Sequence, residues 1–175
     1  ETGAAQYYRD ARILTIYEGT TAIQANDLVG RKTARDGGRT ALEIARQIGE
    51  TEAQLGARDS VAAHAMARRL EAARIAFEQA VVFIAGQAKA NPNAAFAGSV
   101  PYMMLAGNLV AGWQMARALI AAEDRLAAGE DEAFMTAKIA TARFYAEHIL
   151  ARARGLRDAI VEGGDSVTAL ALEAF

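Results

Sequence analysis

The sequence predicts an all-α protein, an antiparallel bundle of about four long helices, and three observations carry that prediction. Hydrophobic residues make up 53% of the 175-residue chain and charged residues 23%, which is enough apolar material for one continuous core. Proline occurs only at Pro92 and Pro101, and alanine-rich composition favours helix almost everywhere. Apolar residues also recur every three or four positions over long stretches, which places them on one face of a helix.

Stop signals divide these stretches into four helices, which we expect over residues 38–55, 60–90, 101–128 and 131–162. The breaks are Gly56 with Asp59-Ser60, Asn91-Pro92, Gly129 with Asp131, and Gly163-Gly164. The third helix has an alternative form, which begins near Asn93 and kinks at Pro101. We expect five aromatic residues in apolar helical runs to lie in the core: Phe77, Phe83, Trp113, Phe134 and Phe144. Residues 165–175 would add a short helical turn or a docked tail.

The first third of the chain has a different pattern. Residues 3–11 suit the end of a helix, residues 13–17 an extended or irregular segment, and a new helix is expected from Thr20 to about Lys32. Paired glycines stop a helix, so Gly37-Gly38 marks the best boundary. We therefore divide the chain into residues 1–36 and residues 37–175. The start at Glu1, without an initiator methionine or a signal peptide, leads us to expect a fragment of a longer protein.

Charge and composition also exclude several functions. The net charge of -2 gives no electrostatic reason to expect nucleic acid, and the absence of cysteine excludes disulfides and thiolate metal sites. His64 and His148 are expected to be surface or interhelix hydrogen-bonding groups, so we predict no metal. Residues 90–116 carry no charge, but their asparagines, prolines and small residues favour a buried bundle helix over a membrane span. We expect a bacterial cytoplasmic location.

The stretch "ILTIYEGTTAIQ", residues 13–24, places one carboxylate at a corner before a helix. Thr20 is a good N-cap, and the first turn of a helix offers free N–H groups to an anion or a cofactor oxygen. Partial desolvation beside Ile16 and Tyr17 would raise the pKa of Glu18 and make it a better proton acceptor. The alternative is that Glu18 only caps the helix while Tyr17 packs as a hydrophobic staple.

The longer run "YRDARILTIYEGTTAIQANDLVGRK" resembles the end of the catalytic region of flavin-dependent acyl-CoA dehydrogenases. The resemblance implies that Glu18 is the catalytic base, which takes the α-proton of an acyl-CoA thioester while the β-hydride passes to FAD. It also implies that Tyr17 and Gly19 line the substrate pocket, and that Thr20, Thr21 and Ile23 lie near FAD. Two departures weaken finer roles: Ala22 stands where many members have glutamine, and the surroundings of Arg31 differ from the usual pattern.

About 140 residues follow this helix. In this the chain resembles the longer subgroup of the family, which has a C-terminal helical extension and includes 3-methylmercaptopropionyl-CoA dehydrogenase-like proteins. The closing stretch "GGDSVTAL" is similar to the end of that subgroup. The resemblance implies an electron-transfer flavoprotein as acceptor and a homo-oligomer, either a dimer or a tetramer. We expect the arginines of the extension to be solvated, with a contact to a CoA phosphate as the less favoured alternative: Arg68, Arg69, Arg152, Arg154 and Arg157. The competing hypothesis is a non-catalytic all-α module for oligomerisation or interaction.

Overall fold

The computed structural model describes residues 3–16 and 19–174, and within these ranges every regular element is helical. The helices that precede the bundle are α1 (Ala4–Ala11), the 3-10 helix η1 (Arg12–Thr15), α2 (Thr21–Asp27), the π-helix η2 (Leu28–Thr33) and the 3-10 helix η3 (Ala34–Asp36). The bundle contains α3 (Arg39–Gly56), α4 (Val61–Ala90), α5 (Pro92–Ala97), α6 (Ser99–Ala127), α7 (Glu132–His148), the 3-10 turn η4 (Leu150–Arg152) and α8 (Ala153–Val161). Two short pieces, α9 (Gly164–Val167) and η5 (Leu172–Ala174), end the chain. The predicted all-α class is confirmed.

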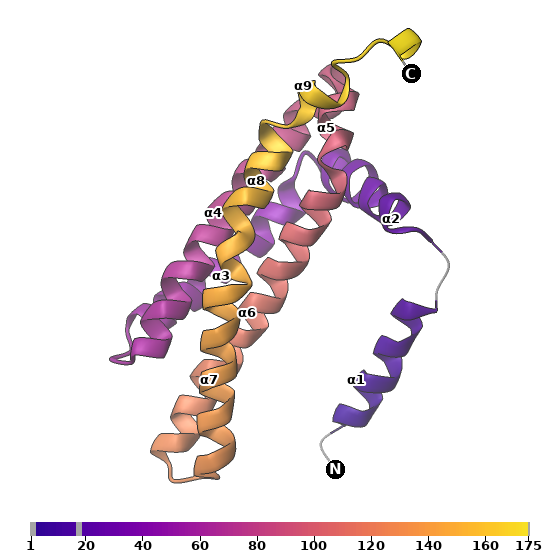
Figure 1. Cartoon of the computed structure of the whole chain (residues 1–175). Helices are drawn as coiled ribbons and strands as arrows, with labels where there is room; N and C mark the ends of the chain where they lie inside the picture. Colours follow the sequence, from indigo (N-terminus) through magenta and orange to yellow (C-terminus); the bar gives the residue numbers. More distant parts are fainter. Residues whose placement is uncertain (1–2, 17–18, 175) are drawn as a thin grey trace.

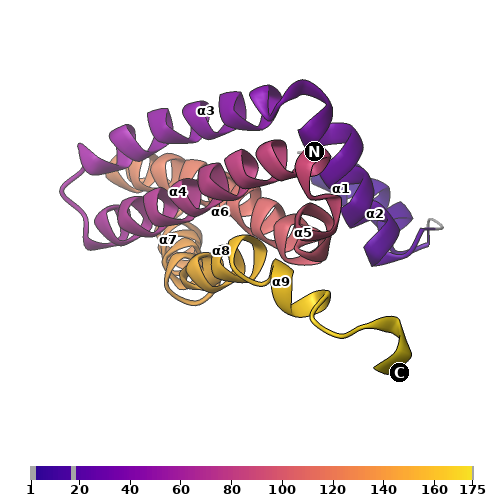
Figure 2. The same ribbon diagram turned by 90° about the horizontal axis from the view of Figure 1, so that it is seen from above.

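The long helices run antiparallel and side by side (Figure 1). Seen from above, α4 and α6 form the middle, α3 covers one side of them, and α7 with α8 covers the other (Figure 2). The loops between successive helices are short, which holds neighbours in sequence beside each other in space. The chain therefore forms one bundle whose core lies between the two central helices and their covers.

The core contains the apolar stripes that the sequence indicates. Ile48 and Leu55 of α3, Leu70 and Ile84 of α4, and Ile160 of α8 are fully buried. Alanine is frequent between them, so that the helices approach closely. At Gly112 of α6 the approach is close, because an added Cβ would lie 2.7 Å from Leu150 Cδ2. Among the described residues no helix is long and apolar enough to cross a membrane.

The third predicted helix, residues 101–128, is found as α6, but its alternative form from Asn93 is wrong: the chain breaks at Gly98 and does not kink at Pro101. Pro101 lies in the first turn of α6, where its missing N–H costs no helical hydrogen bond. The fourth predicted helix is interrupted, which corrects the sequence interpretation. Residues 132–161 are broken around Ile149 by the turn η4. Leu150 in that turn is buried over Gly112, and this contact accompanies the change of helix direction.

The expectation for the aromatic residues is partly wrong. Phe77 is buried, and Phe83 and Trp113 are half-buried against the core, but Phe134 is 52% exposed and Phe144 is 57% exposed. Both lie on α7, whose core face is formed by its neighbours Met135, Ala142 and Ala146. Lys138 Nζ lies 5.1 Å from the ring centroid of Phe134, and His148 stacks on Phe144 at 4.4 Å.

Three polar contacts tie α3, α4 and α6 together. The Trp113 indole N–H donates to Thr51 Oγ1 at 2.7 Å, and Arg74 Nε lies 2.9 Å from Glu52 Oε1. At the α3–α4 turn, Arg58 forms an ion pair with Glu123 at 3.2 Å. These contacts join different helices, so they fix the register of the bundle beyond what apolar packing specifies.

Candidate functional site

The predicted catalytic residue Glu18 and its neighbour Tyr17 lie outside the described residues. The segment before them, residues 12–15, is the 3-10 helix η1 instead of the expected extended or irregular chain. Thr15 Oγ1 donates to the Arg12 carbonyl at 2.9 Å and accepts from Arg12 Nη1 at 2.8 Å, which closes this tight turn. The flanks of the candidate site are the chain up to Ile16 and the chain from Gly19 onward.

The flank after Glu18 begins at Gly19, which has a positive φ of 139°. This backbone conformation is one that residues with a Cβ rarely adopt, so it favours glycine; a Cβ here would also lie 2.5 Å from the amide nitrogen of Gln24, the flexible end of that side chain. Thr20 follows as the N-cap of α2, and its Oγ1 accepts a hydrogen bond from the Ile23 N–H at 3.3 Å. The predicted helix start at Thr20 is confirmed.

The first turn of α2 is open on its outer side. Thr21 is exposed, and the side chain of Ile23 is 62% exposed although it is large and apolar. Ala25, on the opposite side of the helix, is fully buried, and α2 packs against α6 at this point. The bundle thus holds one face of α2 and leaves the face with the predicted cofactor residues uncovered.

The helix that starts at Thr20 changes type after Asp27, a feature that the sequence pattern does not indicate. Residues Leu28–Thr33 form a π-helix, and such wider turns are frequent at functional sites. Its last residue, Thr33, is buried, and Thr33 Oγ1 lies 2.9 Å from Tyr102 OH of α6 in a hydrogen bond. Tyr102 in turn stacks on Phe77 of α4, with ring centroids 5.7 Å apart.

Burial raises the pKa of Tyr102 to about 12, so its phenol remains protonated at neutral pH. The hydrogen bond to Thr33 acts in the opposite direction, and the smaller charge effect of Asp36 adds to the rise. A neutral phenol can donate to Thr33 or accept from it, and the bond links the segment after the predicted base to both central helices. The 69-residue separation of the two partners left no local signal from which the sequence could have revealed this bond.

Arg31 points to a neighbour on its own helix. Its Nε and Nη2 atoms lie 2.6 Å and 3.0 Å from the two carboxylate oxygens of Asp27, in a two-pronged ion pair. The hydrogen bond from Arg31 lowers the pKa of Asp27 below its ordinary value. Arg31 is thus engaged locally, which agrees with the departure from the usual family pattern at this position.

The chemistry-bearing residues of the bundle lie apart from this site. His64 and His148 are exposed on different helices, and over residues 3–16 and 19–174 no group of three potential metal-binding side chains comes together. Arg68, Arg69, Arg154 and Arg157 line a groove between α4 and α8, whereas Arg152 is exposed outside it. Two large aromatic side chains of α1 are exposed: Tyr7 at 80% and Tyr8 at 82%. Figure 1 shows α1 away from the bundle.

An all-α bundle that follows the sequence Tyr-Glu-Gly-Thr is what the resemblance to acyl-CoA dehydrogenases leads us to expect at the C-terminal end of such an enzyme. Residues 44–171 match the family described as acetyl-CoA dehydrogenase C-terminal like, and the chain belongs to that family. It is 51% identical, over 98% of its length, to 3-methylmercaptopropionyl-CoA dehydrogenase of Ruegeria pomeroyi. It is 33% identical, over 97% of its length, to the broad-specificity linear acyl-CoA dehydrogenase FadE5 of Mycobacterium tuberculosis. The chain spans 29% of the length of each relative.

Proposed function

We propose that this chain is the C-terminal part of an FAD-dependent acyl-CoA dehydrogenase, in which Glu18 removes the α-proton of an acyl-CoA thioester. The observation that carries the proposal is the place of the sequence Tyr-Glu-Gly-Thr in the chain. Its last residue, Thr20, caps a helix that the bundle holds on one face only. A base needs such fixed support, because proton abstraction from a weak carbon acid requires close and stable alignment.

The residues after Glu18 have defined parts in this proposal. Gly19 allows the backbone to pass close to the thioester, and the N–H of Glu18 would hold the thioester oxygen as negative charge develops there. Tyr17 would line the acyl side of the pocket. Thr20, Thr21 and Ile23 would contact FAD, and the exposure of Thr21 and Ile23 fits a surface that a cofactor covers. FAD, when bound, would accept the hydride from the β-carbon.

The test is Glu18→Gln in a protein that carries this chain together with the upstream part found in its relatives. Glutamine keeps the size of the side chain but cannot accept the proton. We therefore expect exchange of the substrate α-proton with deuterated water to slow by about 10²–10⁴-fold, while the flavin content stays within twofold. Glu132→Gln, on an exposed α7 position remote from α2, is the matched control and should exchange at the normal rate. Normal exchange in the Glu18 variant would remove Glu18 from the mechanism.

The 175-residue chain alone should neither bind FAD tightly nor reduce a dye with acyl-CoA. Its candidate cofactor face is open, and the bundle supplies no second wall to it. Flavin fluorescence measured on the purified chain checks this expectation, with added FAD and gel filtration to remove the unbound cofactor. Stoichiometric flavin that survives the filtration would contradict it.

The electron-transfer flavoprotein as acceptor and a dimeric or tetrameric assembly belong to the same proposal. The exposed Phe134 and Phe144 on α7 favour, as a second candidate, an all-α oligomerisation module in which Glu18 is only a cap. The exchange experiment separates the two, because the module hypothesis predicts no effect of Glu18→Gln on turnover.

A further inference from the structure

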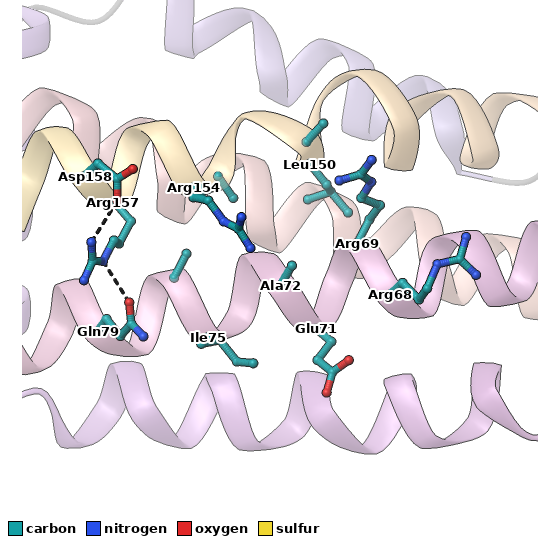
Figure 3. A pocket seen from close by; sticks show the side chains of 13 residues that line it. Arg68, Arg69, Glu71, Ala72, Ile75, Gln79, Leu150, Arg154, Arg157 and Asp158 are labelled. Atoms are coloured by element: carbon teal, nitrogen blue, oxygen red, sulfur yellow. Dashed lines mark hydrogen bonds and ion pairs between the residues drawn. The ribbon is translucent and has the colours of Figure 1, made fainter.

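A groove with a volume of about 700 Å³ opens between α4 and the segment formed by η4 and α8 (Figure 3). This volume lies within the range of about 300–1,000 Å³ that is typical of small-molecule sites. The groove exists because small side chains line both walls, Ala72 and Ala76 on α4 and Ala151 and Ala153 opposite. Leu150 adds an apolar surface to its lining.

The groove carries an excess of positive charge. Arg68 and Arg69 come from α4, Arg154 and Arg157 come from α8, and the two acidic residues in the lining are Glu71 and Asp158. We call this site the arginine groove. In Figure 3 the Arg154 side chain extends from α8 toward α4, and the Arg69 side chain extends from α4 in the opposite direction.

Neither acidic residue neutralises the centre of the arginine groove. The Glu71 side chain points away from Arg69 and Arg154 in Figure 3. Its charge acts on Glu52 of α3. The pKa of Glu52 is raised chiefly by burial, and the negative charge of Glu71 raises it further. Asp158 is engaged by Arg157, at 2.8 Å.

Arg157 closes one end of the groove. Its Nε donates to Gln79 Oε1 of α4 at 2.8 Å, and its Nη1 lies 2.6 Å from Glu162 Oε1. By contrast, Arg68, Arg69 and Arg154 have no hydrogen bond or ion pair to a carboxylate within residues 3–16 and 19–174. Arg69 acts only through space on Glu147, whose pKa is lowered chiefly by its hydrogen bond with Arg143.

We propose that the arginine groove binds a phosphorylated nucleotide, with Arg68, Arg69 and Arg154 on the phosphate oxygens. Guanidinium groups suit phosphate because their planar N–H forks match its oxygens, and their hydrogen bonds are charge-assisted. A phosphate ion alone would leave most of the 700 Å³ unused. Among the lining residues, the exposed Ala72, Ile75 and Ala151 offer an apolar surface to a base and a sugar. Free nucleotides and the nucleotide tail of an acyl-CoA share this chemistry, and the proposal does not depend on the role of Glu18.

Isothermal titration calorimetry on the 175-residue chain tests the proposal, with adenosine 3′,5′-bisphosphate and inorganic pyrophosphate as probes. Arg69→Ala and Arg154→Ala should each weaken binding of the bisphosphate about tenfold, and Arg154→Lys should retain part of the affinity. Arg152→Ala is the matched control, because Arg152 is exposed two residues away and does not line the groove. It should bind within twofold of the unmodified chain. Circular dichroism of each variant excludes loss of helix as the cause.

If an acyl-CoA displaces the bisphosphate, the natural ligand is the nucleotide tail of the coenzyme. If the acyl-CoA does not displace it, the natural ligand is a free nucleotide. Both outcomes support nucleotide binding. Absence of binding at millimolar bisphosphate, equal losses in Arg152→Ala and Arg154→Ala, or pyrophosphate that binds as tightly as the bisphosphate would each overturn it. Glu18→Gln should bind normally, so the result stays separate from that of the exchange experiment.

Discussion

The hydrogen bond between Thr33 and Tyr102 adds a buried polar contact between the segment after Glu18 and the bundle. Tyr102→Phe keeps the ring and its stack on Phe77 but leaves the buried Thr33 hydroxyl without this partner. We expect the free energy of unfolding to fall by about 1–2 kcal/mol, measured by urea denaturation. Tyr145→Phe is the control, because Tyr145 OH donates to the Asn108 carbonyl at a half-buried site and should cost less than about 1 kcal/mol. Equal losses would contradict the special role of Tyr102.

The same phenol predicts a dependence on pH. Tyr102 has a pKa of about 12 in the folded chain, against an ordinary value of 10.0 for an exposed tyrosine. The folded state therefore holds this proton more tightly, so its contribution is complete below pH 10 and is lost as the pH rises toward 12. The stability difference between the unmodified chain and Tyr102→Phe should fall above pH 10, by at most roughly 1.4 kcal/mol per pH unit, and should be lost before pH 12. A difference that stays constant from pH 9 to pH 12 would refute the assignment.

At the residue scale, the sequence predicted contacts that are local. The Thr20 cap follows from the residue type and its place before an apolar repeat, and Gly19 follows from the corner it forms. The Thr33–Tyr102 bond could not be predicted, since it depends on how α2 and η2 pack against α6. The aromatic errors have a similar origin: Phe134 and Met135 are neighbours, and only the packing partner decides which of them faces the core.

At the scale of the elements, two glycines of α6 allow the effect of close packing on stability to be measured apart from the effect of helix propensity. Gly112 lies where a Cβ would be 2.7 Å from Leu150, whereas a Cβ at the exposed Gly107 would meet nothing within 4 Å. Gly112→Ala should lower the free energy of unfolding by about 1–3 kcal/mol through overpacking. Gly107→Ala should raise it by about 0.5–1 kcal/mol, because alanine is the better helix former. Thermal denaturation of both variants measures whether each one loses or gains stability. A stabilised Gly112→Ala would show that η4 does not pack against α6 as described.

The long helices were predictable as elements because their apolar repeats are sustained and end at capping residues. The interruption of the fourth helix was not, since nothing around Ile149 in the sequence breaks a helix. The π-helix at Leu28–Thr33 is a further case, because the same residues suit an ordinary α-helix. The division of the chain at residue 36 stays a prediction; the observed basis for it is the positive φ of Gly37 and Gly38, 69° and 83°.

At the scale of the whole molecule, one side of the chain is a closed bundle and the other is an open face. The bundle buries its own core, whereas α1 and the first turn of α2 expose Tyr7, Tyr8 and Ile23. The chain spans 29% of the length of the relatives it matches. Under the proposed function, the open face would meet the upstream part of the enzyme, and the bundle would hold the helix after Glu18 through the buried residues Ala25, Val29 and Thr33.

Flavin reduction in a single turnover tests the central claim most directly. The protein that carries this chain with its upstream part is loaded with FAD and mixed anaerobically with an acyl-CoA, and the flavin absorbance is followed by stopped flow. In Glu18→Gln the flavin should remain oxidised over at least a hundredfold longer time than in the unmodified protein, although substrate still binds. Flavin that bleaches at the normal rate in Glu18→Gln would contradict the account.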